Sequence, residues 1–168
     1  MQSPEPPAHT FSSKPAIVGL ETLTLATNGH ARNGHPATQS KPSGRVWKVA
    51  AIIPCFNRRA DLEILLKDVA AQALPGIELW CLVVDNASSQ ALSTLAVPAE
   101  LEVEFLRLEK NSGGSGGFNA GMAHVISGAG LTGVHGRPDF IWWLDSDARA
   151  GRRCLIELVK VLAKYPKV

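Results

Sequence analysis

Two carboxylates near the end of the chain have the spacing of a metal site. Asp145 and Asp147 come directly after the apolar run Phe140–Leu144, and alternate residues of an extended strand lie on one face. Two carboxylates about 4 Å apart repel each other by about 4 kcal/mol at an effective dielectric constant of about 20, and a divalent cation between them reverses the sign. Oxygen ligands suit Mg²⁺ or Mn²⁺. The alternative is a solvated turn that caps the next helix, a position in which Asp is common.

A glycine-rich segment is the second candidate site. The run Asn111–Gly117 (NSGGSGG) has glycine at four of the five positions from 113 to 117. Each ordered glycine costs about 0.5–1 kcal/mol of extra backbone entropy, so an ordered loop of this kind needs a compensating contact. Backbone N–H groups close to phosphate oxygens at a helix start are such a contact, and a flexible connector is the alternative. The run is not a dinucleotide-binding fingerprint, because Asn119 stands where G-x-G-x-x-G needs its last glycine.

Two more polar segments follow apolar runs earlier in the chain, PCFNR at residues 54–58 and DNAS at residues 85–88. Phe56 is suited either to stack on a base or to cover the edge of a sheet. Arg58 is placed to approach a phosphate, although a surface charge is the plainer interpretation. Asp85 can accept a hydrogen bond from a base N–H or a ribose hydroxyl, or it can close a turn with Asn86.

Short apolar runs alternate with amphipathic helices from about Arg45 onward. Four strands are expected, at Val46–Pro54, Ile77–Val84, Leu101–Leu108 and Phe140–Leu144. Helices are expected at Arg59–Ala73, Ala87–Leu95, Gly116–Ser127 and from about Arg152. This alternation indicates an α/β fold, a parallel sheet with right-handed crossovers and helices on both faces. Because ligands bind at the carboxyl ends of the strands in such a sheet, all four polar segments are predicted to lie on one edge.

The overall composition is that of a folded domain with little net charge. Lys and Arg number 17 and Asp and Glu 15, a net charge of +2 that gives no support to nucleic-acid binding. Hydrophobic residues make up 45% of the chain, enough to bury a core. The three cysteines have no C-x-x-C spacing, which indicates mostly buried, reduced thiols in a cytoplasmic protein. No stretch reaches the roughly 20 apolar residues of a membrane span.

The first 44 residues differ in composition from the rest of the chain. Pro, Ser, Thr, Asn, Gly and His dominate there, which is typical of a disordered or weakly ordered segment. Only Ile17–Leu25 has the alternation of a short strand. The folded domain is therefore expected to span residues 45–168.

Taken together, the four polar segments resemble those of the inverting family 2 glycosyltransferases, which have the GT-A fold. The matching segments, in the family's order and spacing, are VAAIIPCFNR (49–58), LVVDNAS (82–88), the run Asn111–Gly121 and WWLDSDA (142–148). The resemblance covers about residues 46–160, and the glycine-rich run is most similar to the galactofuranosyl- and rhamnosyltransferase branch. It implies a Rossmann-like parallel sheet with helices on both faces. This chain is then expected to contain the N-terminal, donor-binding half of that domain and to be incomplete at its C-terminus.

The resemblance also implies a role for each motif residue. The expected donor-binding residues are Pro54, Phe56, Asn57, Arg58, Asp85, Asn111, Gly113, Gly114 and Asp145. Among them, Asp85 would recognise a uracil or thymine ring and Asp145 would lie near the ribose. Asp147, with Asp145, would bind the Mn²⁺ or Mg²⁺ ion that bridges the diphosphate and neutralises the charge on the leaving group.

The implied activity is the transfer of a sugar, with inversion, from a UDP- or dTDP-linked donor to a hydroxyl of a carbohydrate or lipid-linked acceptor. Such a reaction belongs to cell-wall polysaccharide biosynthesis, in the cytoplasm or at the membrane surface in a longer form of the protein. The family takes its general base from beyond the metal motif, where no position of this sequence corresponds, so no catalytic residue is named. Two alternatives stay open: a non-catalytic nucleotide-binding remnant or fragment, and a nucleotidyltransferase, although that class places its glycine-rich basic loop after the first strand.

Overall fold

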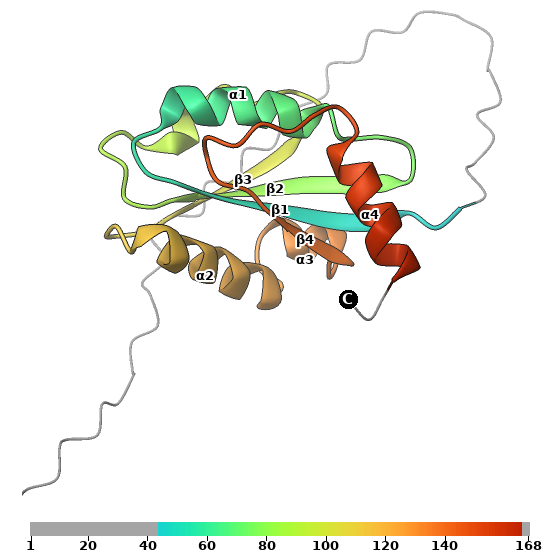
Figure 1. Cartoon of the computed structure of the whole chain (residues 1–168). Coiled ribbons are helices and arrows are strands. Elements are labelled where there is room, and N and C mark those ends of the chain that lie inside the picture. Colours follow the sequence, from blue (N-terminus) through green and yellow to red (C-terminus); the bar gives the residue numbers. More distant parts are fainter. Residues whose placement is uncertain (1–43, 166–168) are drawn as a thin grey trace, which may run out of the picture.

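A four-stranded parallel sheet with helices on both faces makes up the described part of the chain, residues 44–165 of the computed structural model (Figure 1). The strands are β1 (Trp47–Cys55), β2 (Ile77–Asp85), β3 (Glu102–Arg107) and β4 (Phe140–Trp143), in the spatial order β3-β2-β1-β4. The helices are α1 (Arg59–Ala70), α2 (Gly113–Ile126), α3 (Leu131–His135) and α4 (Cys154–Lys164), with one 3₁₀ turn, η1 (Leu92–Thr94). The expected α/β fold is confirmed, whereas the expectations for residues 1–43, including the Ile17–Leu25 strand, lie outside the described residues.

The two central strands are buried on both faces, which explains why their sequences are almost continuously apolar. Figure 1 shows α1 on one side of the sheet and α2 with α3 on the other, while α4 lies beside the β4 edge. Val49, Ala51 and Ile53 of β1 point to the α1 side, and the alternate residues Ala50 and Ile52 point to the α2 side.

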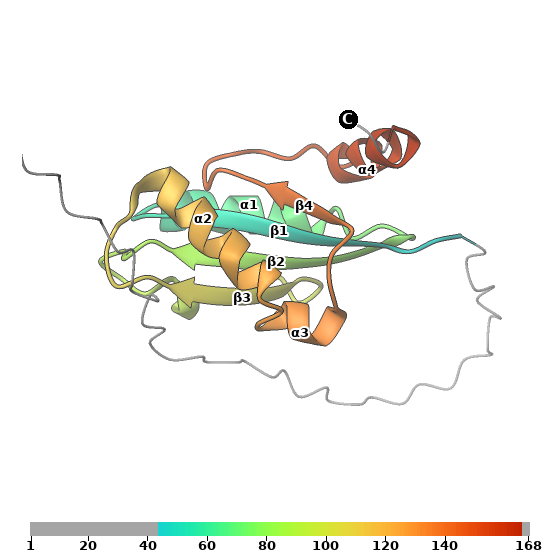
Figure 2. The same ribbon diagram turned by 90° about the horizontal axis from the view of Figure 1, so that it is seen from below.

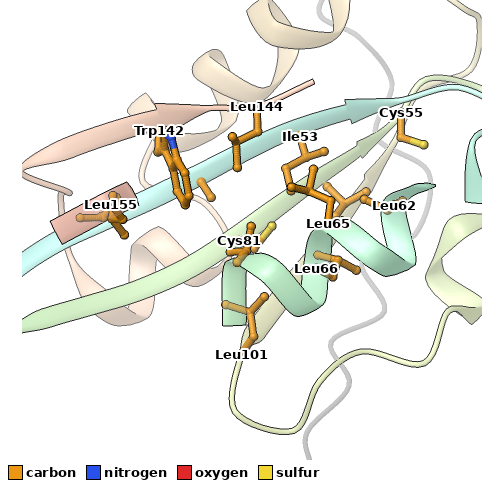
Figure 3. Close-up of a cluster of buried hydrophobic side chains, with 14 of the residues drawn as sticks. Ile53, Cys55, Leu62, Leu65, Leu66, Cys81, Leu101, Trp142, Leu144 and Leu155 are labelled. Atoms are coloured by element: carbon orange, nitrogen blue, oxygen red, sulfur yellow. The ribbon is translucent and has the colours of Figure 1, made fainter. Parts of the chain in front are cut away.

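The larger hydrophobic core lies between the sheet and α1 (Figure 3). The helical spacing predicts an apolar stripe of five residues on this helix, and four of them are fully buried: Leu62, Leu65, Leu66 and Val69. The fifth, Ala73, lies beyond the end of α1 and is exposed. Burial of each such side chain contributes about 1.5–3 kcal/mol. This helix therefore docks on the sheet mainly through its apolar stripe.

Helix α4 packs against the same core with only two of its six Leu, Ile and Val side chains. Leu155 and Val159 are buried, whereas Leu158 is 44% exposed. Its start is held by the fully buried side chain of Gln72, whose Nε2 donates to Gly151 O (2.9 Å) and whose Oε1 accepts from Leu155 N (3.1 Å). A buried amide with paired donor and acceptor thus connects the end of α1 to the beginning of α4.

Helix α2 packs closely on the sheet because two of its residues have no side chain at the contact. A Cβ atom on Gly121 would lie 2.5 Å from Ile52 Cγ2 and 3.0 Å from Val84 Cγ2. A Cβ atom on Gly117 would lie 2.7 Å from Pro54 Cβ. Gly117 and Gly121 are four residues apart and so share one face of the helix. Part of the glycine-rich segment therefore serves packing between helix and sheet.

The strands lie within one residue of the bounds that the sequence predicts, whereas the helices differ more; α1, for example, ends at Ala70 rather than Ala73. The expected helix Ala87–Leu95 is wrong: only η1 forms, because Ala87 has a left-handed φ of 63° that a helix does not accept. Helix α2 begins at Gly113, three residues before the expected Gly116. The short helix α3 was not expected at all, and it follows a backbone turn at Gly130 (φ 54°).

Glu104 on β3 connects the sheet to α2 and α3. Its Oε1 lies 2.7 Å from His124 Nε2, and its Oε2 accepts a hydrogen bond from Leu131 N (2.9 Å). Burial alone raises the pKa of Glu104, but the hydrogen bonds from His124 and Leu131 outweigh it, so the net pKa lies below the ordinary value of 4.5. Folding therefore favours the ionised form of this carboxyl group.

The close approach of α2 gives a first prediction. Gly121→Ala should lower the free energy of unfolding by about 1–3 kcal/mol, because the added Cβ meets two packed strand side chains and this outweighs the better helix propensity of Ala. Urea unfolding measures the change. Gly114→Ala is the matched control, since a Cβ at Gly114 has no atom within 4 Å. Equal effects of the two substitutions would contradict the packing role of Gly121.

The lowered pKa of Glu104 gives a second prediction. A carboxyl group whose pKa is lower in the folded state stabilises the protein above its unfolded pKa, and this contribution is lost as the pH falls through the folded pKa. Glu104→Gln should therefore cost about 1 kcal/mol at neutral pH. The difference between wild type and variant should shrink between about pH 5 and about pH 3 in urea unfolding. A difference that stays constant over this range would contradict the linkage.

Candidate functional site

The four polar segments predicted to meet do follow the carboxyl ends of the four strands. Cys55, Asp85 and Arg107, the last residues of β1, β2 and β3, are joined in register, so these three strands end at one level. In Figure 2 the strands point toward the left, where α2 begins. We call this region, with residues 54–58, 85–88, 111–117 and 145–147, the carboxyl edge.

Asn57 ties the first segment of the carboxyl edge to the second. Its backbone N donates to Ser88 Oγ (3.1 Å), and its side-chain Oδ1 accepts from both the backbone N (2.8 Å) and the Oγ (3.0 Å) of Ser89. Asn57 has a φ of 55°, a left-handed conformation that Asn tolerates better than most residues. These three bonds hold the turn after β1 against the turn after β2.

Asn86 ties the second segment to the glycine-rich segment in the same manner. Its Nδ2 donates to Gly113 O (2.9 Å), and its Oδ1 accepts from Ser112 N (2.9 Å) and Ser112 Oγ (3.1 Å). The side chain is almost fully buried, so these bonds replace contacts with water. The start of α2 is thereby fixed beside the end of β2.

Asp85 is buried, and its carboxylate is already surrounded by donors. Only 2% of the residue is exposed. Oδ1 accepts from Ser88 N (2.8 Å), while Oδ2 accepts from Leu92 N (3.1 Å) and from the guanidinium of Arg107. Each carboxylate oxygen can accept two bonds, so one acceptor position remains, on Oδ1. Its predicted contact with a base is therefore restricted to that single lone pair.

The glycine run contains positions of two kinds. Gly117 and Gly116 are in crowded surroundings, the first against Pro54 and the second against Ser112, where a Cβ would lie 2.5 Å from the side chain. Gly113, with a φ of 72°, and Gly114 face open space. Ser112 makes no side-chain cap to the helix, so the N–H groups of Gly114 and Ser115, which follow that of Gly113, have no capping side chain at this open surface. Asn111 lies beside them and accepts from Gly113 N (2.8 Å).

The two aspartates after β4 are exposed, and the residue between them is buried. Asp147 Oδ2 lies 3.2 Å from Nη1 of Arg58, which also lies 3.4 Å from Asp61 Oδ2. This pair connects the first segment to the fourth. Ser146, between the two aspartates, is buried, and burial also raises the pKa of the Cys55 thiol at the end of β1.

The carboxylates suit a hard cation but do not enclose one. Among residues 44–165, no group of three or more His, Cys, Asp or Glu side chains is arranged to hold a metal ion. Two exposed carboxylates can still hold Mg²⁺ or Mn²⁺ where phosphate oxygens and water complete the coordination, which is usual for these ions. Asp145 and Asp147 therefore fit a cation that arrives with a phosphate ligand.

The remaining predicted residues line the outer surface of the carboxyl edge. Pro54 is half-buried at the end of β1, and Phe56 is 43% exposed just beyond it. The sequence did not indicate the role of Arg107, because its partner Asp85 is a neighbour only through the β2–β3 register. The sequence did offer one signal for Arg107: it is a basic residue at the end of an expected strand, on the edge that the sequence predicts to be functional.

A parallel α/β sheet with polar segments at its carboxyl edge defines a nucleotide-binding class of domain. The chain belongs to glycosyl transferase family 2, whose model matches residues 50–168. The predicted family and its GT-A fold are confirmed, whereas the galactofuranosyl- and rhamnosyltransferase branch stays a prediction. Membership in this family also decides against the nucleotidyltransferase alternative.

Solved structures share this fold at low sequence identity. S. aureus TarS residues 1–349 in complex with UDP-GlcNAc is 22% identical with a TM-score of 0.57, over 71% of this chain and 32% of that chain. Mannosyltransferase PcManGT from Pyrobaculum calidifontis in complex with GDP-Man and Mn²⁺ is 22% identical with a TM-score of 0.54, over 73% of this chain and 34% of that chain. This chain thus spans about a third of the length of these proteins. No curated protein matches it significantly.

Within residues 44–165, every helix is too short or too polar to span a bilayer. The free cysteines fit the sequence prediction, since Cys55 and Cys81 are buried and only Cys154 is exposed. Burial raises the pKa of both buried thiols, which makes them poor nucleophiles.

The contacts of Asn86 give a third prediction. Asn86→Ala should leave the backbone N–H of Ser112 without its acceptor. Because the lost hydrogen bond has a net value of about 1 kcal/mol, the amide hydrogen of Ser112 should exchange with solvent about fivefold faster. Hydrogen exchange followed by NMR measures this rate at a single amide. Ser115→Ala, an exposed position of the same run, is the control and should leave the Ser112 rate unchanged. An unchanged Ser112 exchange rate in Asn86→Ala would contradict the role of Asn86 in holding the start of α2.

Proposed function

We propose that the carboxyl edge binds a nucleoside-diphosphate sugar together with a divalent cation, and that the protein of which this domain is part transfers the sugar with inversion. The observation that carries this proposal is the junction of all four segments: Asn57, Asn86 and Arg58 each connect two of them. One ligand with a base, a sugar and a diphosphate has the length to touch every segment of such an edge.

The base is assigned to the surface between the first two segments. Phe56 offers an exposed ring for stacking, and Pro54 and Asn57 shape the turn beside it. Asp85 offers the remaining lone pair of Oδ1 to an N–H group at the edge of the base. Uracil and thymine both carry such a group at N3, which supports a UDP- or dTDP-linked donor.

The sugar and diphosphate are assigned to the start of α2. Gly113 and Gly114 face open space there, so a phosphate oxygen can approach the N–H groups of Gly114 and Ser115, whereas that of Gly113 already donates to Asn111 Oδ1. Asn111 lies on the same surface, and Arg58 adds a guanidinium from the first segment. A helix N-terminus and an arginine both favour the negative charge of a diphosphate.

The cation is assigned to Asp147, with Asp145 beside it near the ribose. A bound Mn²⁺ or Mg²⁺ supplies Lewis-acid stabilisation of the charge that develops on the leaving diphosphate. In the free protein Arg58 neutralises Asp147 through an exposed ion pair, which is worth only about 0–1 kcal/mol and is easily exchanged. The acceptor is proposed to be a hydroxyl of a carbohydrate or a lipid-linked saccharide.

Titration calorimetry of the chain with UDP tests the proposal. We expect UDP to bind about tenfold or more tightly with Mn²⁺ than without it, because the ion joins two anionic groups. Asp147→Ala should remove this dependence on the metal. Asp139→Asn is the matched control, since Asp139 also pairs with an arginine (Arg45) but lies at the amino end of β4. Binding that is equal with and without Mn²⁺ in the wild type would exclude the metal-dependent site.

A further inference from the structure

The segment between β4 and α4 contains the two aspartates of the proposed metal site, and the end of α1 holds it in place. Figure 1 shows this segment running back along α1 before α4 begins. The side chain of Gln72, just beyond α1, is fully buried against it. Its Nε2 donates to the carbonyls of Gly151 (2.9 Å) and Asp68 (3.1 Å), and its Oε1 accepts from Leu155 N (3.1 Å). Both hydrogens of the amide are thus used, and its three backbone partners determine which way it faces.

Asp68 makes a second connection from α1 to the same segment. Its Oδ2 accepts from Arg149 Nε (2.7 Å) and Ala150 N (3.3 Å), and its Oδ1 accepts from Arg149 Nη2 (3.3 Å). Because the side chain of Arg149 is 63% exposed, the ion pair by itself stabilises little. The forked contact and the backbone bond together nevertheless fix the direction in which the chain leaves the aspartates.

The turn that carries the aspartates lies between this connection and β1. On the near side, Leu144 N donates to Ile52 O (3.1 Å). Ala148 N then donates to Asp145 O (2.9 Å), which closes a tight turn around residues 146 and 147. The contacts with α1 begin at the next residue of the chain. The turn is therefore anchored to β1 at one end and to α1 at the other.

Anchoring matters here because the two carboxylates are exposed and carry like charges. Repulsion between Asp145 and Asp147 favours conformations in which the two side chains separate. A cation needs both of them at one place, and groups that are ordered in advance lower the cost of binding it. The exposed ion pair between Asp147 and Arg58 is too weak to impose this order. The anchors on β1 and α1 supply it from behind the site.

We propose that Gln72 and Asp68 are positioning residues for the metal site: from the end of α1 they fix the turn on which Asp145 and Asp147 meet a divalent cation. This inference rests on the proposed function and adds to it two residues that lie outside the carboxyl edge. Neither side chain needs to touch the nucleotide or the cation, because both act through the segment that follows the turn.

Hydrogen exchange followed by NMR tests the anchoring in the chain without any ligand. The amide of Ala148 closes the turn by donating to Asp145, so its exchange rate reports the order of the turn. Asp68→Ala should speed this exchange about fivefold, the effect of losing one net hydrogen bond. Val69→Ala is the matched control, because it truncates a fully buried side chain at the neighbouring position of α1. It should leave the Ala148 rate unchanged, whereas an unchanged rate in Asp68→Ala would overturn the inference.

Calorimetry with UDP tests the consequence for the site. In the wild-type chain Mn²⁺ should tighten UDP binding about tenfold. Asp68→Ala should reduce this gain to less than about threefold and leave the affinity for UDP without metal unchanged, because only the aspartate turn has lost its order. Val69→Ala should keep the full gain. Equal weakening of UDP with and without Mn²⁺ in Asp68→Ala would indicate a general structural defect and overturn the inference.

Gln72→Met tests the second positioning residue. Methionine has a similar volume but forms none of the three hydrogen bonds, so the gain from Mn²⁺ should fall as it does in Asp68→Ala. A Gln72→Met variant that folds and keeps the full gain would overturn the role of Gln72. If this variant does not fold, Asp68→Ala decides the inference alone, since Asp68 is partly exposed and its loss leaves the core intact.

The wild-type measurement separates the two possible failures. If Mn²⁺ does not change the affinity of the wild-type chain for UDP, the proposed metal site fails and the inference fails with it. If the wild type shows the gain and both variants keep it, the proposed function stands and only the inference is overturned.

Discussion

The buried carboxylate of Asp85 is the constraint on which the carboxyl edge depends. An unpaired buried charge is expensive by several kcal/mol, so it persists only where donors surround it. Its donors come from two separate parts of the chain, the turn at Ser88 and Leu92 and the end of β3 at Arg107. Satisfying this one charge therefore fixes the turn after β2 relative to β3. That turn in turn holds the segment after β1 through the hydroxyl of Ser88.

The glycine-rich segment shows how one run of residues can serve packing and binding together. Ordered glycines need a compensating contact, and at Gly117 and Gly121 that contact is the sheet itself. The close approach brings the beginning of α2 to the level at which the strands end. Only Gly113 and Gly114 then remain open to a ligand. Packing therefore compensates the entropy cost of ordering half of the glycines in the run. Only the first residues of the run still support a phosphate site.

The sequence predicted the parallel sheet and its functional edge, because both follow from short-range patterns. Continuous apolar runs indicate strands that are buried on both faces, and each polar segment directly follows such a run. The contacts of Asp85 depend instead on the β2–β3 register, which places Arg107 beside it, and no local pattern contains that register. The expected helix at 87–95 is wrong for a more local reason, which begins with the left-handed φ of Ala87. The N–H groups of Ser88 and Leu92 are taken by the Asp85 carboxylate, an acceptor that helix propensity does not include.

The four segments of the carboxyl edge are not held equally. Hydrogen bonds of Asn57 and Asn86 join the first three, and those of the Asn86 side chain are partly withdrawn from water, so the surfaces assigned to the base and the diphosphate exist before a ligand binds. Preformed contacts of this kind reduce the ordering cost of binding. The carboxylates after β4 are exposed, and their one ion pair, with Arg58, is the weakest link of the edge. A cation at this proposed position would therefore gain its affinity from the ligand that arrives with it, so metal binding would be a consequence of nucleotide binding rather than a precondition.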